Sequence, residues 1–131
     1  PTAEPTDVTY AEETIGGVPG IWALPVGADR ARVLLYLHGG GFAVGSAASH
    51  RKLAGHLAKA VGATAFVLDY RRAPEHRHPA QVEDGVAAFR SGLVAAYQSL
   101  DPAVMSEDED PAERLPLADL HDMIDRAFRR P

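Results

Sequence analysis

The chain has 131 residues and a mass of 14.0 kDa, with 46% hydrophobic and 24% charged residues, as in an ordinary globular domain. It contains no cysteine, which excludes disulfides, zinc–thiolate sites, iron–sulfur clusters and a cysteine nucleophile among these residues. Nine acidic and nine basic side chains balance in residues 1–100, so the whole net charge of −5 falls in residues 101–131. Without a basic face we expect no nucleic-acid partner, and the short apolar runs predict no membrane span.

The first residues of the sequence are polar and lack both the basic and the apolar region of a secretory signal. No lipidation signal is visible either. We therefore expect a cytoplasmic protein.

The first third of the chain predicts strands. Residues 8–15 and 18–25 flank the turn signal Gly16-Gly17, which favours an antiparallel hairpin. Residues 27–32 are predicted to form a turn. The continuous apolar run 33–37 is typical of a strand that is buried on both faces.

Two helices and one more strand are predicted next. The first helix is capped by Ser46 or Ser49 and stops at Gly62, the following strand covers residues 64–68, and Pro79 is the first residue of the second helix. The order β-β-β-α-β-α implies a sheet with parallel, right-handed crossovers. The predicted buried stripe of the first helix is His50, Leu53, Ala54, Leu57, Ala58 and Val61. That of the second is Val82, Val86, Phe89, Leu93 and Tyr97.

The end of the chain has a different character. Residues 106–111 are a polar, acidic break, and an apolar stripe follows at helical spacing. We expect residues 106–131 to form an acidic linker and a short amphipathic helix of unclear origin, whose stripe is Leu117, Leu120, Ile124 and Phe128.

A triple glycine stands directly after the strand at residues 33–37, in the sequence His38-Gly39-Gly40-Gly41-Phe42. Residues without Cβ let the backbone turn sharply and approach a ligand closely. Their amides can then face a developing negative charge, as in an oxyanion hole. A tight structural turn is the simpler interpretation of three glycines alone.

The context of the triple glycine favours the oxyanion hole. Residues 38–42 resemble the HGGG motif of esterases and lipases. Residues 69–80 resemble the second signature of the hormone-sensitive-lipase-like (bacterial family IV) esterases, which usually reads close to Tyr-Arg-Leu-Ala-Pro-Glu-His, followed by Pro-Ala. The resemblance covers residues 8–105, because residues 100–103 also resemble the segment that leads into the nucleophile strand.

The resemblance implies an α/β fold, namely the N-terminal half of an α/β-hydrolase. It also implies hydrolysis of carboxylic esters with short acyl chains, on a small-molecule substrate and without a cofactor. It assigns the amides of Gly39, Gly40 and Gly41 to the oxyanion hole, and gives His38 the role of supporting that loop. The second signature would shape the neighbouring loop and hold it by salt bridges that include Arg71 and Glu75. Its matching residues are Tyr70, Arg71, Pro74, Glu75, His76 and Pro79.

The nucleophile of the family is a serine in G-x-S-x-G, and no serine of this sequence has glycines at those two positions. Asp119, His121 and Asp122 match no family motif, so they are given no triad role. We therefore expect residues 1–105 to be a partial α/β-hydrolase domain from a truncated chain whose activity alone is in doubt. The serines considered are Ser46, Ser49, Ser91, Ser99 and Ser106.

Two other functions remain as alternatives. The chain is an inactive ligand-binding or interaction module on the same fold, or His38, His76 and His78 converge on a metal, although the family has a histidine at the first position without any metal. We expect no metal site, and we interpret His50 and His56 as ordinary helix residues. Because half a sheet exposes apolar surface, self-association or pairing with a missing C-terminal half is expected.

Overall fold

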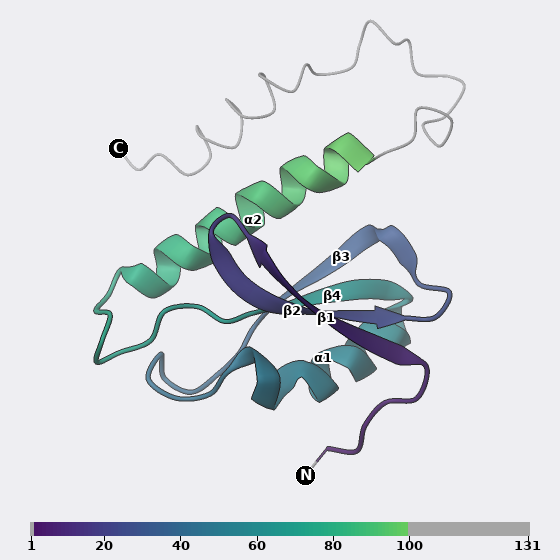
Figure 1. The fold of residues 1–131 in the computed structure, drawn as a ribbon, viewed down its shortest axis with the longest axis horizontal. Helices are drawn as coiled ribbons and strands as arrows, with labels where there is room; N and C mark the ends of the chain where they lie inside the picture. The colour runs from purple at the N-terminus through teal and green to yellow at the C-terminus, as the bar shows by residue number, and fades with distance from the viewer. Residues whose placement is uncertain (1, 100–131) are drawn as a thin grey trace, which may run out of the picture.

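The computed structural model describes the backbone of residues 2–99 and the side chains of residues 2–92 (Figure 1). The predicted order β-β-β-α-β-α is confirmed, whereas the predicted tail of residues 106–131 lies outside the described residues. No helix of the described part has the length and apolar character needed to cross a bilayer. The elements are β1 (Val8–Ile15), β2 (Val18–Pro25), β3 (Asp29–Leu37), α1 (Ala47–Val61), β4 (Ala63–Leu68) and α2 (Ala80–Ser99).

The four strands form one mixed sheet in the order β1-β2-β4-β3. The predicted hairpin of β1 and β2 is confirmed, and its turn has positive φ at both Gly16 (61°) and Gly17 (78°), as a two-residue hairpin turn requires. β3 and β4 are parallel and joined by α1, so their carboxyl ends meet at the same edge of the sheet. This topology brings the loop after Leu37 beside the loop after Leu68.

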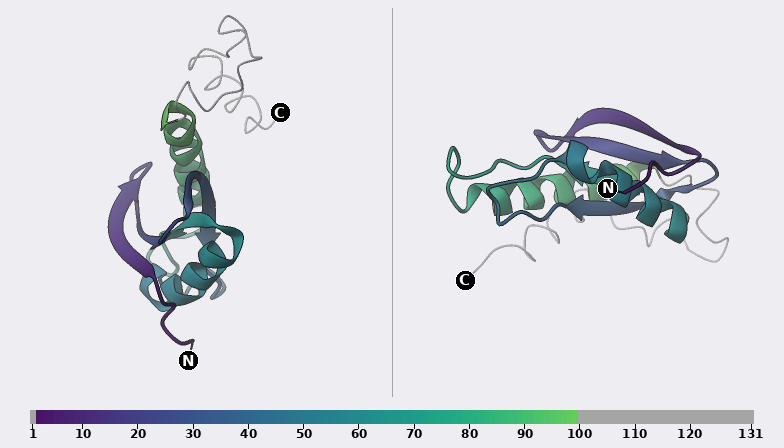
Figure 2. Two further views of the ribbon diagram at one scale, coloured as in Figure 1. Left: turned by 90° about the vertical axis from the view of Figure 1, so that its right-hand side faces the viewer. Right: turned by 90° about the horizontal axis from the view of Figure 1, so that it is seen from below.

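The two helices cover opposite faces of the sheet, as the two views of Figure 2 and the packing of β4 indicate. All six residues of β4 are buried, as the sequence predicts for this strand. Ala65 and Val67 pack in the core beneath α1, whereas Phe66 and Leu68 pack in the core beneath α2. The alternation of side chains along one strand thus divides the core into two layers.

The predicted buried stripes of both helices are wrong in their large residues. On α1, Leu53, Leu57 and Val61 are 40–48% exposed, and on α2, Val82 and Phe89 are 51% and 43% exposed. The predicted burial of Ala54 and Ala58 is confirmed, and α1 approaches the sheet through small side chains, which allow closer contact than leucine or valine would. The buried residues are Ala47, Ala54, Gly55 and Ala58 on α1, and Ala80, Gln81, Asp84 and Ala88 on the described part of α2, where the predicted Val86 is partly buried. The side chains of Leu93 and Tyr97 lie outside the described part.

β3 also differs from its prediction. It begins at Asp29, within the predicted turn, and its pairing with β4 is irregular between Asp29 and Val33. Val33 and Leu37 are 43% and 48% exposed because β3 is an edge strand of the described sheet, with no strand on its outer side. The run 33–37 is therefore half-buried and not covered on both faces.

The ends of the helices follow the sequence closely. Ser46 is the N-cap of α1, where its hydroxyl accepts from Ser49 N, and the Ser49 hydroxyl accepts from Ser46 N. Gly62 ends α1 with φ 65°, the left-handed conformation that glycine adopts at low cost. α2 begins at Ala80, so Pro79 precedes the helix and is not its first residue.

Candidate active site

The loop after β3 takes a backbone conformation that requires glycine at position 40 and favours it at position 41. Gly40 has φ 125° and Gly41 has φ 61°, and Phe42, although not a glycine, also has φ 61°. A Cβ on Gly40 would lie 2.1 Å from Val44 O, which no side chain tolerates. The loop closes on itself through hydrogen bonds from Ala43 N (3.2 Å) and Val44 N (3.1 Å) to Gly40 O.

The amides of the three glycines are available to a ligand. Gly39, Gly40 and Gly41 are exposed, and none of their N–H groups donates a hydrogen bond within the described part of the chain. A Cβ on Gly39 or Gly41 would meet no atom within 4 Å. The loop therefore presents free backbone donors on an open surface, as an oxyanion site needs.

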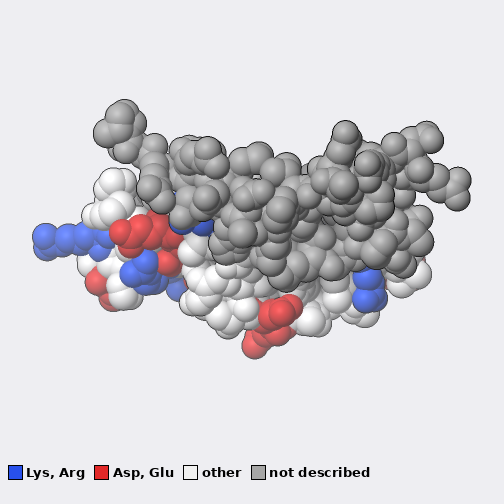
Figure 3. All heavy atoms as spheres, turned by 90° about the horizontal axis from the view of Figure 1, so that it is seen from above, with Lys and Arg blue, Asp and Glu red and all other residues white. Residues whose placement is uncertain are grey.

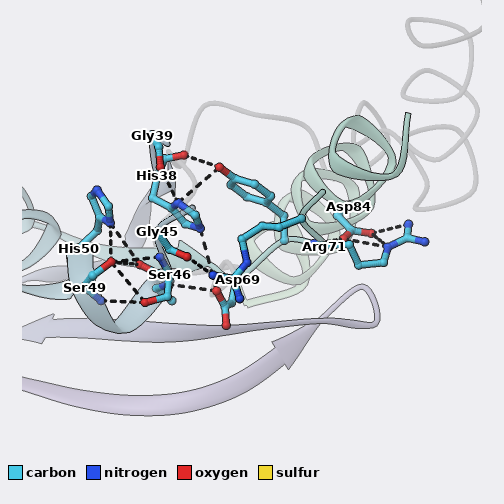
Figure 4. A network of polar contacts seen from close by, with 12 residues as sticks. His38, Gly39, Gly45, Ser46, Ser49, His50, Asp69, Arg71 and Asp84 are labelled. Atoms are coloured by element: carbon cyan, nitrogen blue, oxygen red, sulfur yellow. Dashed lines mark hydrogen bonds and ion pairs between the residues drawn. The ribbon is translucent and has the colours of Figure 1, made fainter. Parts of the chain in front are cut away.

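His38 lies behind this loop and is buried (Figure 4). Its Nδ1 lies 2.9 Å from Gly39 O, and because a carbonyl oxygen only accepts, Nδ1 carries the hydrogen. Its ring stacks on Tyr70, with centroids 4.3 Å apart, and on His50, with centroids 5.2 Å apart. Tyr70 Oη donates to His38 O at 2.6 Å, and burial raises the pKa of the Tyr70 phenol. The strand end and the start of the loop are thus held by a stack of three rings.

Asp69 lies at the base of the same loop. Its Oδ1 accepts from Ala47 N, the first residue of α1, at 3.2 Å. The same oxygen lies 4.0 Å from His38 Nε2, a buried nitrogen that makes no hydrogen bond among the described residues. The contact joins the end of β4 to the end of β3 across the sheet edge.

The residues after Tyr70 bind the far side of the glycine loop. Ala73 N donates to Phe42 O at 2.8 Å, and the Arg72 guanidinium donates to Gly45 O. Arg72 stands where the usual signature has leucine, so this second contact depends on a departure from the family pattern. The two loops are therefore joined at several points along their length.

The loop after β4 is itself tied to α2 by an ion pair. Arg71 contacts the carboxylate of Asp84 through Nη2 at 2.7 Å and Nε at 3.0 Å, and its backbone N donates to the same group at 2.8 Å. Burial disfavours the charge of Asp84, but the hydrogen bonds and charge of Arg71 outweigh it and hold the pKa of Asp84 below its usual range. The hydrogen bond with Asp84 raises the pKa of Arg71 in turn. Glu83 adds an exposed contact at 3.3 Å, and Figure 3 shows acidic and basic side chains gathered where α2 begins.

Some predicted members of the second signature have smaller parts. Glu75 is exposed and makes no ion pair among the described residues, so its predicted salt bridge is wrong, and the carboxylate partner of Arg71 is Asp84. Pro74 and Pro79 are exposed. His76 acts through its backbone, since its N donates to Arg72 O at 2.9 Å and its carbonyl accepts from a glutamine side chain of α2.

The three histidines considered for a metal do not come together. His38 is buried, whereas His76 and His78 are exposed, and residues 2–92 contain no cluster of three or more histidine, aspartate or glutamate side chains that could hold an ion.

Sequence reasoning missed two members of this site. His50 is no ordinary helix residue, because it stacks on His38 and its Nδ1 lies 3.2 Å from Ser46 O. Asp69 was visible only as the first residue of the second signature. The clue was position: the end of β4 must meet the end of β3 in a parallel pair.

A family model described as the alpha/beta hydrolase fold matches residues 34–105, more than half of the chain. The chain belongs to the alpha/beta hydrolase family. An acetyl-hydrolase of Streptomyces hygroscopicus is 51% identical over 77 residues, which cover 59% of this hydrolase chain and 25% of the relative. A carboxylesterase of Mycobacterium tuberculosis is 43% identical over 91 residues, which cover 67% of this chain and 28% of that protein.

Solved structures agree with these relatives. The crystal structure of an esterase from the bacterial hormone-sensitive lipase family matches with a TM-score of 0.69 and 43% identity, over 72% of this chain and 32% of the other. The resemblance to hormone-sensitive-lipase-like esterases and the predicted fold class are thereby confirmed. The hydrolase chain spans about a quarter of the length of the curated relatives it matches.

Proposed function

We propose that the hydrolase to which this chain belongs cleaves carboxylic esters, with the amides of Gly39, Gly40 and Gly41 as its oxyanion hole. The observation that carries the proposal is the set of exposed backbone donors on a loop whose shape requires glycine at position 40. The names of the relatives, an acetyl-hydrolase and a carboxylesterase, favour a small ester with a short acyl group as substrate.

The chemistry assigned to the loop is stabilisation of charge. A nucleophile adds to the ester carbonyl, the carbonyl π electrons move onto oxygen, and the resulting oxyanion accepts hydrogen bonds from the loop amides. The bond to the alkoxide then breaks as the carbonyl re-forms, and the alkoxide takes up the proton that the nucleophile lost and leaves as the alcohol. Water then adds to the acyl intermediate in the same way, which releases the carboxylic acid and restores the nucleophile. The nucleophile is expected to be a serine in a G-x-S-x-G elbow, which the 131 residues do not contain. His38 would support the loop from behind without touching the substrate.

A chimera tests this proposal with a full set of catalytic residues. Residues 8–99 of this chain replace the aligned segment of the Mycobacterium tuberculosis carboxylesterase, and hydrolysis of p-nitrophenyl acetate is measured. We expect the chimera to be active, and Gly40→Ala to lower kcat by about a hundredfold or more because the loop must change shape. Gly92→Ala on α2, outside the glycine loop, is the matched control, since its Cβ would meet no atom within 4 Å. Equal kcat values for the two variants would exclude the oxyanion role.

A second part of the proposal concerns the apolar side chains that β3 and α1 leave exposed. The described sheet ends at β3, where Val33 and Leu37 are exposed, and Leu53 and Leu57 on α1 are at least 40% exposed. A soluble domain rarely leaves so many large apolar side chains uncovered. We expect the chain to self-associate or to pair with further parts of a hydrolase domain. Light scattering after size-exclusion chromatography tests this, and a monodisperse monomer would contradict it.

A further inference from the structure

The side chain of Asp69 lies close to both ends of the glycine loop. The loop leaves the sheet at His38 and enters α1 at Ala47, and Asp69 Oδ1 lies 4.0 Å from His38 Nε2 and 3.2 Å from Ala47 N (Figure 4). We propose that Asp69 is a positioning residue, which clamps the base of the oxyanion loop and does so more tightly when His38 Nε2 carries a proton. This proposal rests on the proposed function only in treating the glycine loop as an oxyanion hole.

The contact with Ala47 fixes the far end of the loop. The first N–H groups of a helix have no partner inside the helix, and they need an acceptor from elsewhere. Ser46 and Ser49 satisfy each other in the capping box, whereas Ala47 N is left to Asp69. Because Asp69 follows β4 directly, this bond ties the start of α1 to the most deeply buried strand of the sheet.

The contact with His38 depends on a hydrogen. Nδ1 already carries one, which it directs at Gly39 O, so in a neutral ring Nε2 has only a lone pair. That lone pair faces a carboxylate oxygen, and two acceptors cannot bond to each other. With a proton on Nε2, the two groups attract each other across the present 4.0 Å, and a closure of about 1 Å makes a charge-assisted hydrogen bond. The His38 side chain is fully buried and Nε2 makes no hydrogen bond among the described residues, which leaves Asp69 as its acceptor.

Few other ionisable groups face the His38 ring. Tyr70 stacks on one face, and its Oη lies 3.3 Å from Nδ1, while His50 stacks at 5.2 Å and belongs to α1. Arg72 is a cation of the same network, and it contacts Gly45 O. Among the described residues the acid that contacts the ring is Asp69, so we expect its carboxylate to respond to a charge on His38.

The test is amide hydrogen exchange of the 131-residue chain, followed by NMR at Ala43, Val44 and Ala47, whose N–H groups hold the loop closed. Ring ¹⁵N shifts report whether His38 is neutral or doubly protonated, and protection factors are compared in the two states. We expect protection to rise about tenfold when His38 is protonated.

Two variants of Asp69 separate positioning from mere packing. Asp69→Asn keeps an acceptor for Ala47 and adds an amide donor that suits the neutral ring, so we expect protection to be higher with His38 neutral, the reverse of the natural chain. Asp69→Ala removes both contacts and lowers protection about tenfold or more in both states. Even if Asp69→Ala does not fold, Asp69→Asn still tests the proposal, because it should reverse the effect of His38 protonation on amide protection.

Controls make each outcome informative. Glu75→Gln, which removes an exposed carboxylate from the same loop, must keep the natural response to protonation. If Asp69→Asn responds like the natural chain, or if the natural chain does not respond, the clamp is wrong. Loss of esterase activity in the chimera with an intact clamp would overturn only the proposed function.

Discussion

The loop after β3 and the loop after β4 leave the same edge of the sheet, but they are held in different ways. The first presents exposed glycine amides and relies on its neighbours for support, through contacts with Tyr70 and Asp69. The second is fixed to α2 by the ion pair of Arg71 and Asp84. A loop that must offer free backbone donors cannot use them for its own stability, so a second loop supplies the support.

Arg71→Met is expected to have the largest effect on stability. It leaves the carboxylate of Asp84 buried, with a side-chain exposure of only 9% in the natural chain, and keeps just the bond from the backbone N of residue 71. Breaking one partner of such a pair should lower the free energy of unfolding by about 2–3 kcal/mol. Urea denaturation of Arg71→Met and of the natural chain measures this loss of free energy.

Arg77→Met is the matched control for this prediction, because Arg77 is exposed on the same loop and makes no ion pair among the described residues. A change of less than about 0.5 kcal/mol is expected there. Equal losses in the two variants would mean that the ion pair does not anchor the second loop.

Gly40→Ala is expected to lower the free energy of unfolding by about 1–3 kcal/mol, through both its φ of 125° and the approach of Cβ to Val44 O. Gly39→Ala should cost less than about 0.5 kcal/mol, since nothing lies within 4 Å of its Cβ. Thermal and urea unfolding of both variants test the difference. If Gly40→Ala unfolds with the same free energy as the natural chain, the backbone of the first loop does not require glycine at position 40.

Tyr70→Phe should cost about 1 kcal/mol, because it removes the hydrogen bond to His38 O and keeps the ring stack. Tyr36→Phe serves as the control, since the Tyr36 hydroxyl makes no hydrogen bond among the described residues. If both substitutions cost the same, the support of the first loop by the second does not depend on this bond.

The pH dependence of stability gives the smallest effect. The pKa of Asp84 is lowered in the folded state, so its contribution is present above the ordinary aspartate pKa of about 3.9 and is lost as the pH falls through the folded value. At neutral pH the free energy of unfolding of Asp84→Asn should therefore be lower than that of the natural chain. This difference should become smaller below about pH 4. Urea titrations between pH 2 and 7 check this, and a constant difference would contradict it.

The hairpin of β1 and β2 and the ends of α1 could be predicted from the sequence because local signals determine them. Gly16-Gly17 defines the hairpin, and the capping box at Ser46 and the left-handed Gly62 define the limits of α1. The buried faces of the helices could not be predicted in the same way. On α1 the alanines pack against the sheet, and the leucines remain exposed.

The glycine loop was visible in the sequence, whereas its supports were not. A motif identifies which residues bend the chain, but the contact of Asp69 with Ala47 joins residues 22 positions apart, and it follows from the parallel pairing of β3 and β4. The partner of Arg71 was missed for a similar reason, since Asp84 lies one turn into α2 and faces back toward the loop.

The central claim is that the first loop supplies the chemistry and the second supplies its support. Measuring kcat and the melting temperature of the chimera carrying Gly40→Ala or Arg71→Met tests this most directly. The account predicts a loss of about a hundredfold or more in kcat for Gly40→Ala, and for Arg71→Met a lower melting temperature with less than about a tenfold change in kcat. A Gly40→Ala chimera that retains full kcat would contradict it.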